Sequence, residues 1–474
     1  MDDWLEEGHL AWFVIDAMTL IDTSAFDEVH PDGPGRPAYD PKILLGLLLY
    51  GYATGVRSSR AIMAACRSDL AYRVIAVNLV PDHRTIARFR AENEQAIETV
   101  FVEVLKLCAK AGLAGLGQIA IDGTKIGSDA ALDQNRDADW IRVEIPKILS
   151  EAATTDATED AAPQLFEAEL PEPLRRRHGR LARLEAALAE VEAEERRAQT
   201  QAEEKKAHAK SEAAAGRKLR GRKPKDPRAA LVRAEADLEA TRVRFAGDEA
   251  GAAALFEAEA AVEAAREAAV EQAPDNYVAN ITDPESRIMK TKDGFLQGYN
   301  VQAAVNADQV IVAYAATQDR NDVAQLFPLI EATTSAAGAA AITEQVGLVL
   351  ADAGYWSEEN ATAEGPDRLI ATTKDWKQRR AARELGETTG PPPEGASPLE
   401  AMEHRLRTPE GAAAYATRSH TVEPVFGDTK ANRGYRRFMR RGLAAAKSET
   451  ALIFAAHNLL KVFHHRPSVV FGAS

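Results

Sequence analysis

Two aspartates in this sequence each follow a short apolar run, and a carboxylate in that position suits a divalent metal ion. Asp122 comes directly after residues 119–121, and Asp352 comes directly after residues 346–351. Both runs predict buried strands, so each carboxylate would be a hard oxygen ligand at the tip of a rigid element. For Asp122 alone, the glycine that follows also fits an ordinary Asp-Gly turn. The recurrence of the pattern favours a metal site.

A third acid, Glu423, stands among basic residues further along the chain, between Arg418 and Lys430. Two aspartates at strand ends and a later glutamate are what a two-metal phosphoryl-transfer site needs. One ion activates the attacking oxygen and the other stabilises the leaving oxygen. Pro424 predicts that a helix starts or kinks beside Glu423. If regular helix continues, Lys430 lies two turns further on the same face, where it could hold a phosphate.

Three motifs that contain these acids resemble those of DDE transposases of bacterial insertion sequences. They are Ile-Asp-Gly-Thr-Lys-Ile, Ala-Asp-Ala-Gly-Tyr and Val-Glu-Pro-Val-Phe-Gly-Asp-Thr-Lys, the last followed by Gly-Tyr-Arg-Arg-Phe-Met-Arg-Arg-Gly. The similarity is to the group with a Tyr-Arg-Glu-Lys motif, and it covers residues 30–132 and 280–465. It implies a ribonuclease-H-like catalytic core in which Asp122, Asp352 and Glu423 are catalytic and bind two Mg²⁺ ions, for which Mn²⁺ substitutes.

The same resemblance implies contacts with double-stranded DNA. The Tyr, Arg and Lys of the motif fall on Tyr415, Arg418 and Lys430, with two residues between the first pair. Six residues separate Glu423 from Lys430, as expected, and four separate Arg418 from Glu423, where three are expected. The basic surface where a scissile strand would run is extended by Arg433, Arg436, Arg437, Arg440 and Arg441.

The charge of the chain is unevenly distributed. The net charge of −14 argues against a generally basic protein that coats DNA, but the local field decides DNA binding. Residues 205–228 carry ten Lys and Arg against two acids, and residues 417–441 carry seven against two. Both stretches therefore predict local anion-binding surfaces.

Residues 165–275 predict an antiparallel coiled-coil hairpin inserted in the catalytic domain, because Leu and Val recur there at near-heptad spacing. The tip of the hairpin resembles an AT-hook, whose Arg-Gly-Arg core enters the minor groove. Here the core is Arg220, a glycine and Arg222, and Lys223 separates it from the following proline. We expect Arg220, Arg222 and Lys223 to contact DNA, and the alternative is a solvated tip.

Residues 1–112 predict an N-terminal helical domain, with helices near 57–66, 68–77 and 82–111. Asp40, followed by a proline in the first turn, is predicted to cap one helix, and Asp82 is predicted to cap another. A helical domain of this size ahead of the catalytic core fits a module that binds DNA ends. The alternative is a structural subdomain whose arginines are only solvated.

The catalytic core, which makes the fold α/β, is predicted in two parts, 113–164 and 276–474. Asp322 is expected to cap a helix, with a supporting role beside the active site as the alternative. His457 is expected to be a packed core histidine. The expected elements are a strand at 117–122, an acidic and partly irregular connection at 133–163, hairpin strands at 297–306 and 310–317, a helix at 322–336, strands at 346–351 and 369–374, and helix from about 400 into Glu423.

Composition excludes several classes of protein. The 474 residues allow two or three domains. No apolar run is long enough to predict a membrane span, and the acidic N-terminus does not predict a signal peptide. The two cysteines, Cys66 and Cys108, have no metal-ligand spacing and are expected to be buried free thiols.

These observations predict a transposase that cuts the ends of its insertion sequence and joins them to target DNA. Three alternatives remain open: a nuclease that only hydrolyses DNA, an inactive DNA-binding protein derived from a transposase, and a structural coiled-coil protein. The resemblance also implies a homodimer on DNA, and a bacterial cytoplasmic location associated with the nucleoid.

Overall fold

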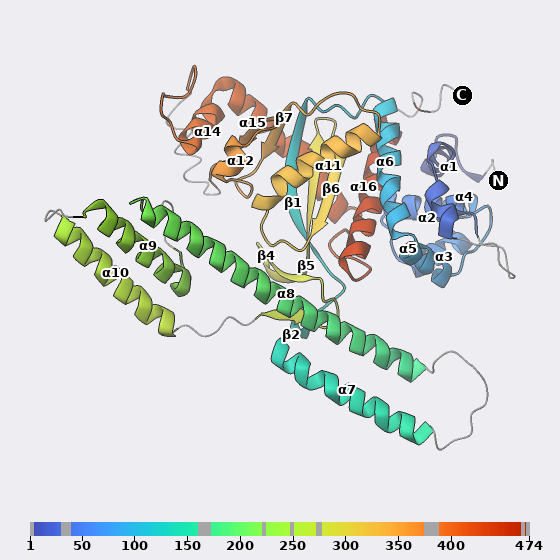
Figure 1. The fold of residues 1–474 in the computed structure, drawn as a ribbon. Coiled ribbons are helices and arrows are strands. Elements are labelled where there is room, and N and C mark those ends of the chain that lie inside the picture. The colour runs from blue at the N-terminus through green and yellow to red at the C-terminus, as the bar shows by residue number, and fades with distance from the viewer. Residues whose placement is uncertain are drawn as a thin grey trace. The chain divides into compact units, whose positions relative to one another are not determined.

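The computed structural model describes residues 4–29, 39–159, 172–219, 224–246, 251–271, 277–373, 388–465 and 470. The chain divides into two compact units (Figure 1). The first unit consists of Met1–Asp133 and Glu285–Ser474, and the second unit consists of Gln134–Pro284. Within the described ranges, no helix is long and apolar enough to cross a membrane.

The first unit begins with a group of helices. Asp40 caps α2 as expected, because its carboxylate accepts from the Lys42 backbone N–H at 2.8 Å and Pro41 occupies the first turn. Asp82 likewise caps α5. The single helix predicted over 82–111 is broken at Asn93, whose backbone leaves the helical range. The elements are α1 (Leu10–Leu20), η2 (Ser24–Val29), α2 (Pro41–Ala53), α3 (Ser59–Ser68), α4 (Leu70–Ile75), α5 (His83–Glu92) and α6 (Glu94–Lys110).

A six-stranded mixed sheet forms the centre of the first unit. Its order is β4-β5-β1-β7-β8, and β6 also pairs with β5. β5 runs antiparallel to β1, β4 and β6, whereas β1, β7 and β8 run parallel to one another. The strands are β1 (Gln118–Gly127), β4 (Arg287–Thr291), β5 (Gly294–Asn306), β6 (Ile311–Thr317), β7 (Leu348–Ala351) and β8 (Asp367–Ile370).

Helices cover both faces of this sheet (Figure 1). α11 packs on β5 and β6 from one face, and α15 and α16 pack from the other. One hydrophobic core runs from the N-terminal helices through the sheet to α16, so the N-terminal helices share the core of the sheet. The elements after β6 are η5 (Val323–Gln325), α11 (Leu326–Ala339), α12 (Glu358–Thr362), α14 (Pro398–Arg407), α15 (Pro409–Ala431) and α16 (Leu443–His465).

Helix α15 continues through Pro424, where the sequence predicted a start or a kink. A proline has no N–H to donate to the carbonyl four residues earlier, here His420. That carbonyl accepts a hydrogen bond at 2.8 Å from the side-chain amide of Gln309 instead. The vacant acceptor is therefore satisfied, and Glu423 and Lys430 lie on one helix.

The second unit consists of helices around a short β-ladder. α7 occupies residues 138–159 of the connection that was expected to be acidic and partly irregular over 133–163. It forms because Ile141, Ile145 and Ile148 line one face of it and pack with Leu184 of α8. α9 contacts both α8 and α10. The elements are η3 (Leu132–Gln134, at the boundary), β2 (Asn135–Asp137), α7 (Ala138–Glu159), α8 (Glu172–Ala214), α9 (Pro227–Arg244), α10 (Ala252–Glu271) and β3 (Val278–Asn280). The predicted DNA contacts Arg220, Arg222 and Lys223 lie outside the described residues.

Candidate active site

Asp122 lies on β1 and its carboxylate is bound by an arginine of α15. The guanidinium of Arg418 makes an ion pair with Asp122 at 3.0 Å, and its second terminal nitrogen lies 3.9 Å from the carboxylate of Glu423. The Arg418 side chain is only 11% exposed. The Asp122 carboxylate also accepts from the backbone N–H of Gly123 at 2.8 Å. Arg418 therefore brings together two acids that lie about 300 residues apart in the sequence.

Asp352 follows β7, the strand that pairs in parallel with β1. Ala351 is the register partner of Ile121, so the two aspartates come directly after paired residues at the same end of the sheet. The Asp352 carboxylate accepts from the backbone N–H of Gly354 at 2.7 Å. This bond turns the chain at the strand tip and leaves Asp352 beside Asp122.

The charges at this end of the sheet are incompletely balanced. Burial raises the pKa of Asp122 to about 6; Arg418 acts against this shift, and the nearby carboxylates of Asp352 and Asp322 add to it. Burial alone would lower the pKa of Arg418, but Asp122 and its acidic neighbours outweigh burial and raise it. Arg418 is thus held as a cation among acids whose negative charge it does not fully compensate.

The donor set at this site is carboxylate oxygen, which suits Mg²⁺ or Mn²⁺. In the described part of the chain, however, no three His, Cys, Asp or Glu side chains are already arranged to hold a metal ion. Arg418 lies between Asp122 and Glu423, and Glu423 is 61% exposed. A metal ion bound through Oδ2 of Asp122 would compete with Arg418 for that oxygen.

Tyr415 and Lys430, two further residues of the predicted motif, also reach this end of the sheet. The Tyr415 hydroxyl donates to the carbonyl of Ala351 at 3.3 Å. The Lys430 ammonium hydrogen-bonds the hydroxyl of Thr124 on β1. Burial lowers the pKa of Lys430, and the neighbouring cations Arg436 and Lys292 lower it further. Both side chains therefore lie on the Asp122 side of the site.

All five arginines between α15 and α16 take part in internal ion pairs or hydrogen bonds. Arg433 is buried and pairs with Asp428 beside His457, so its guanidinium faces the interior. Arg440 pairs with Glu94. The others are exposed: Arg436 donates to the carbonyl of Lys430, and Arg437 and Arg441 both pair with Asp129.

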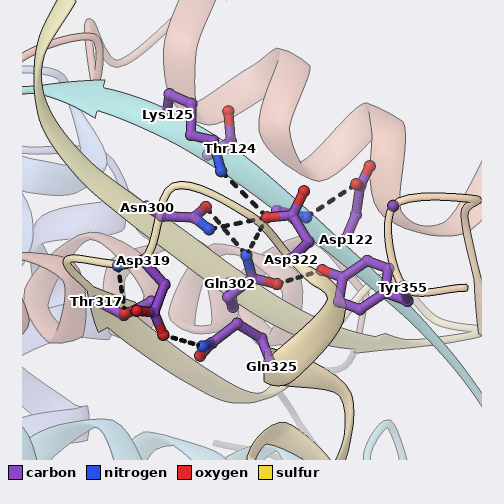
Figure 2. A network of polar contacts seen from close by, with 12 residues as sticks. Asp122, Thr124, Lys125, Asn300, Gln302, Thr317, Asp319, Asp322, Gln325 and Tyr355 are labelled. Carbon is purple, nitrogen blue, oxygen red and sulfur yellow. Dashed lines mark hydrogen bonds and ion pairs between the residues drawn. The ribbon is translucent and has the colours of Figure 1, made fainter. Parts of the chain in front are cut away.

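A polar network that the sequence analysis did not assemble lies beside these residues (Figure 2). One oxygen of Asp322 accepts from Lys125 at 3.1 Å, from Asn300 at 2.8 Å and from Gln302 at 2.9 Å. Asp322 occupies the N-cap position of η5, as predicted, but its side chain makes no capping hydrogen bond. The sequence signal was Asn300 and Gln302, which alternate with apolar residues in a buried strand and so need buried partners.

Comparisons with known protein families agree with part of this assignment. Residues 1–92 match the family model described as a transposase domain (DUF772), and residues 391–463 match the model described as a transposase DDE domain. Neither the curated proteins nor the solved structures gave a match. The two family matches support a DDE-type transposase, an enzyme that acts on DNA. The second match contains Tyr415, Arg418, Glu423 and Lys430, while Asp122 and Asp352 lie outside both.

Proposed function

We propose that this protein is a DDE transposase that cuts the ends of its own mobile element and joins them to target DNA. The observation that carries the proposal is the position of Arg418, which contacts Asp122 and Glu423 and interacts electrostatically with Asp352. The three acids come from β1, the tip of β7 and α15. Their convergence supports a phosphoryl-transfer site.

We further propose that the sheet is a ribonuclease-H-like core with a helical insertion. Three antiparallel strands, β6, β5 and β1, continue into the parallel strands β7 and β8, and this order supports the assignment. The proposed antiparallel coiled-coil hairpin is supported by α8 and α9, which pack through Ala209, Ala213, Ala236 and Ala240. The helices of residues 1–112 are then the module that binds the element ends.

Asp122, Asp352 and Glu423 would hold two Mg²⁺ ions, for which Mn²⁺ would substitute. When bound, the ions would activate the attacking oxygen and stabilise the leaving oxygen. Burial raises the pKa of Asp122, and the carboxylates of Asp352 and Asp322 add to this shift. A bound cation would offset the cost of ionising Asp122, which supports this assignment. The acids therefore serve as ligands, and no side-chain nucleophile is needed.

Arg418 would exchange its carboxylate partner for a phosphate of the DNA. A guanidinium binds carboxylate and phosphate with the same fork of donors. The Nε atom of Arg418 is buried and has no hydrogen-bond partner within the described residues, so it has a donor to offer. Lys430, beside Thr124, would hold a second phosphate oxygen. Exposed Arg436 and Arg437 would extend this contact along the strand, and the pairing of two element ends implies a dimer on DNA.

The proposal is tested by an assay with purified protein, labelled candidate element ends and a target plasmid, with and without Mg²⁺. We expect Mg²⁺-dependent cleavage and strand transfer by the wild type and neither reaction by Asp122→Ala. Asp308→Ala is the matched control, because Asp308 is exposed in the turn between β5 and β6. Cleavage without strand transfer would identify a nuclease instead. DNA binding with neither reaction would point to an inactive protein derived from a transposase.

A further inference from the structure

Lys125 lies three residues after Asp122 on β1. Alternate residues of a strand face opposite sides of the sheet, so Lys125 lies on the other face from Asp122. Its ammonium nitrogen is 3.1 Å from the carboxylate of Asp322, the residue before η5. The end of β1 is thus flanked by two ammonium groups, Lys430 on the Asp122 face and Lys125 on the opposite face.

Asp322 is fixed in place by buried neighbours. The oxygen that binds Lys125 also accepts from Asn300 and Gln302 (Figure 2). Both of these side chains are fully buried. Burial would raise the pKa of Asp322, but Lys125 and these hydrogen bonds outweigh burial and lower it. The carboxylate is therefore an anion whose position is set by β5.

The same network reaches the tip of β7, three residues after Asp352. The Tyr355 hydroxyl donates to the side-chain oxygen of Gln302. The side-chain amide of Asn360 donates to the carbonyls of Tyr355 and Val323, each at 2.7 Å. Asp322 is consequently linked, through Gln302, to the segment that carries Asp352.

The two charged groups are the members of this network that reach the surface. The side chains of Lys125 and Asp322 are 16% and 22% exposed, whereas Asn300, Gln302 and Tyr355 are fully buried. Asp122 has the same 22% exposure. Partly burying a charged pair is costly. Neutral side chains would fill the core at this edge of the sheet at lower cost, so the charged pair points to a further role.

We propose that Lys125 contacts a phosphate of the substrate DNA and that Asp322 is the positioning residue that holds Lys125 there. This inference rests on the proposed function. It adds to the predicted site a second cation from the opposite face of the sheet. The phosphate would then lie between Lys430 and Lys125, beside the part of β1 that follows Asp122.

The first test measures binding to a short labelled DNA duplex as the salt concentration is raised. Lys125→Met should weaken binding and reduce the slope of log affinity against log salt by about one, the value for one lost phosphate contact. Lys125→Arg should keep the slope. Lys106→Met is the matched control, because Lys106 also pairs with an acid, Glu103, but on α6. An unchanged slope in Lys125→Met would overturn the phosphate contact.

The second test uses Asp322→Asn, which removes the charge but keeps the shape and one acceptor oxygen. DNA binding should weaken no more than in Lys125→Met, whereas the single-turnover cleavage rate should fall on the order of 10²-fold, because the cation is misplaced. The double variant Lys125→Met/Asp322→Asn should cleave no more slowly than Lys125→Met. A double variant slowed by the full product of both effects would show that Asp322 acts independently, and would overturn its positioning role.

These two tests distinguish a failure of the inference about Lys125 and Asp322 from a failure of the proposed function. If the wild type binds DNA and does not cleave it with Mg²⁺, the proposed function is refuted. The positioning role of Asp322 in cleavage is then refuted as well. The salt slopes still decide whether Lys125 contacts phosphate. Thermal unfolding of each variant identifies any loss of activity caused by a failure to fold.

Discussion

The two units use the same charged residue types in different surroundings. In the first unit, the side chains of Arg57 and Glu449 pair at 3.0 Å and are 10% and 1% exposed. In the second unit, Arg266 and Glu263 also pair at 3.0 Å, but their side chains are 54% and 64% exposed. A buried pair loses its hydration and must be held by its partners, whereas an exposed pair remains solvated. The difference indicates that the pair between Arg57 and Glu449 fixes geometry in the first unit, whereas the pair between Arg266 and Glu263 does not in the second.

The hydrophobic contacts of the two units differ in the same sense. The first unit has one large core that includes the sheet and the helices on both faces. The described residues of the second unit form two small clusters, one of which contains four alanines, Ala209, Ala213, Ala236 and Ala240. A site that needs side chains held within a fraction of an ångström belongs on the more rigid scaffold. Polar substitutions should therefore have larger effects in the first unit.

The largest expected effect on stability comes from the pair between Arg57 and Glu449. Arg57→Met leaves the buried Glu449 carboxylate without its cation, which should lower the free energy of unfolding by about 3–5 kcal/mol. In the second unit, Arg266→Gln also removes the cation of an ion pair, and it should lower the free energy of unfolding by about 0.5 kcal/mol or less. Urea unfolding of both variants measures the contrast.

Arg57→Met combined with Glu449→Gln should recover much of the loss, because no unpaired charge then remains. Arg57 also donates to the carbonyls of Gly434 and Arg437, so the double variant reports the remaining contribution of these bonds. Equal losses for Arg57→Met and Arg266→Gln would contradict the comparison.

The next effect concerns Asp122, whose substitution should raise the stability of the protein instead of lowering it. Its pKa is raised from 3.8 to about 6, so folding favours the protonated carboxyl. That stabilisation is complete below pH 3.8 and is lost as the pH rises through about 6. Above this range the ionised carboxylate costs roughly 3 kcal/mol. Without metal, Asp122→Asn should exceed the wild type in stability at neutral pH by up to roughly this amount.

The measurement is urea unfolding of Asp122→Asn and wild type across this pH range in the presence of a chelator. The gap in unfolding free energy should widen as the pH rises from the ordinary pKa of an aspartate to the folded-state value. A gap that stays constant with pH would show that the Asp122 carboxylate is not destabilised by its surroundings.

The smallest expected effect concerns two glycines of the first unit. A Cβ on Gly123 would lie 2.4 Å from the Gln302 amide nitrogen and 2.8 Å from the Asp322 carboxylate. Gly123→Ala should therefore cost about 1–3 kcal/mol of unfolding free energy and slow cleavage. Around Gly338, within α11, nothing apart from its chain neighbours and the backbone of the helix itself lies within 4 Å of the Cβ position. Gly338→Ala should stabilise by about 0.5–1 kcal/mol, and thermal unfolding of the pair compares the two. Similar effects from both would contradict the close approach at Gly123.

Features with local causes were predictable from the sequence. Asp40 and Asp82 each accept a hydrogen bond from the backbone N–H two residues later. Such a cap needs no partner from a distant segment, so the local sequence is enough to predict it. The strand that ends at Asp122 was expected at 117–122, but β1 continues to Gly127. Its extension depends on pairing with Tyr299 and Gly298 of β5, and such distant partners are not encoded in the local pattern.

The site was predictable where a motif fixed it and not where partners came from other segments. The structure brings Asp122, Arg418 and Glu423 together, although their catalytic role stays a prediction. An Asp before a helical pattern predicts a helix cap at Asp322, but its side chain makes no capping hydrogen bond. Its actual partners, Lys125 and Asn300, come from two strands. Only the register of β1 on β5 shows that they meet.

The short ladder between β2 and β3 has a consequence for how the sheet assembles. β1 and β5 are paired neighbours, but the whole second unit lies between them in the chain. Bringing distant segments together costs loop entropy and slows folding. Asn135 pairs with Asn280, and Ile281 donates to the carbonyl of Gln134, so the ends of the second unit meet once it folds. The long loop then becomes a short one. We therefore expect the second unit to fold before β1 and β5 pair. Its folding would then increase the rate at which the sheet forms.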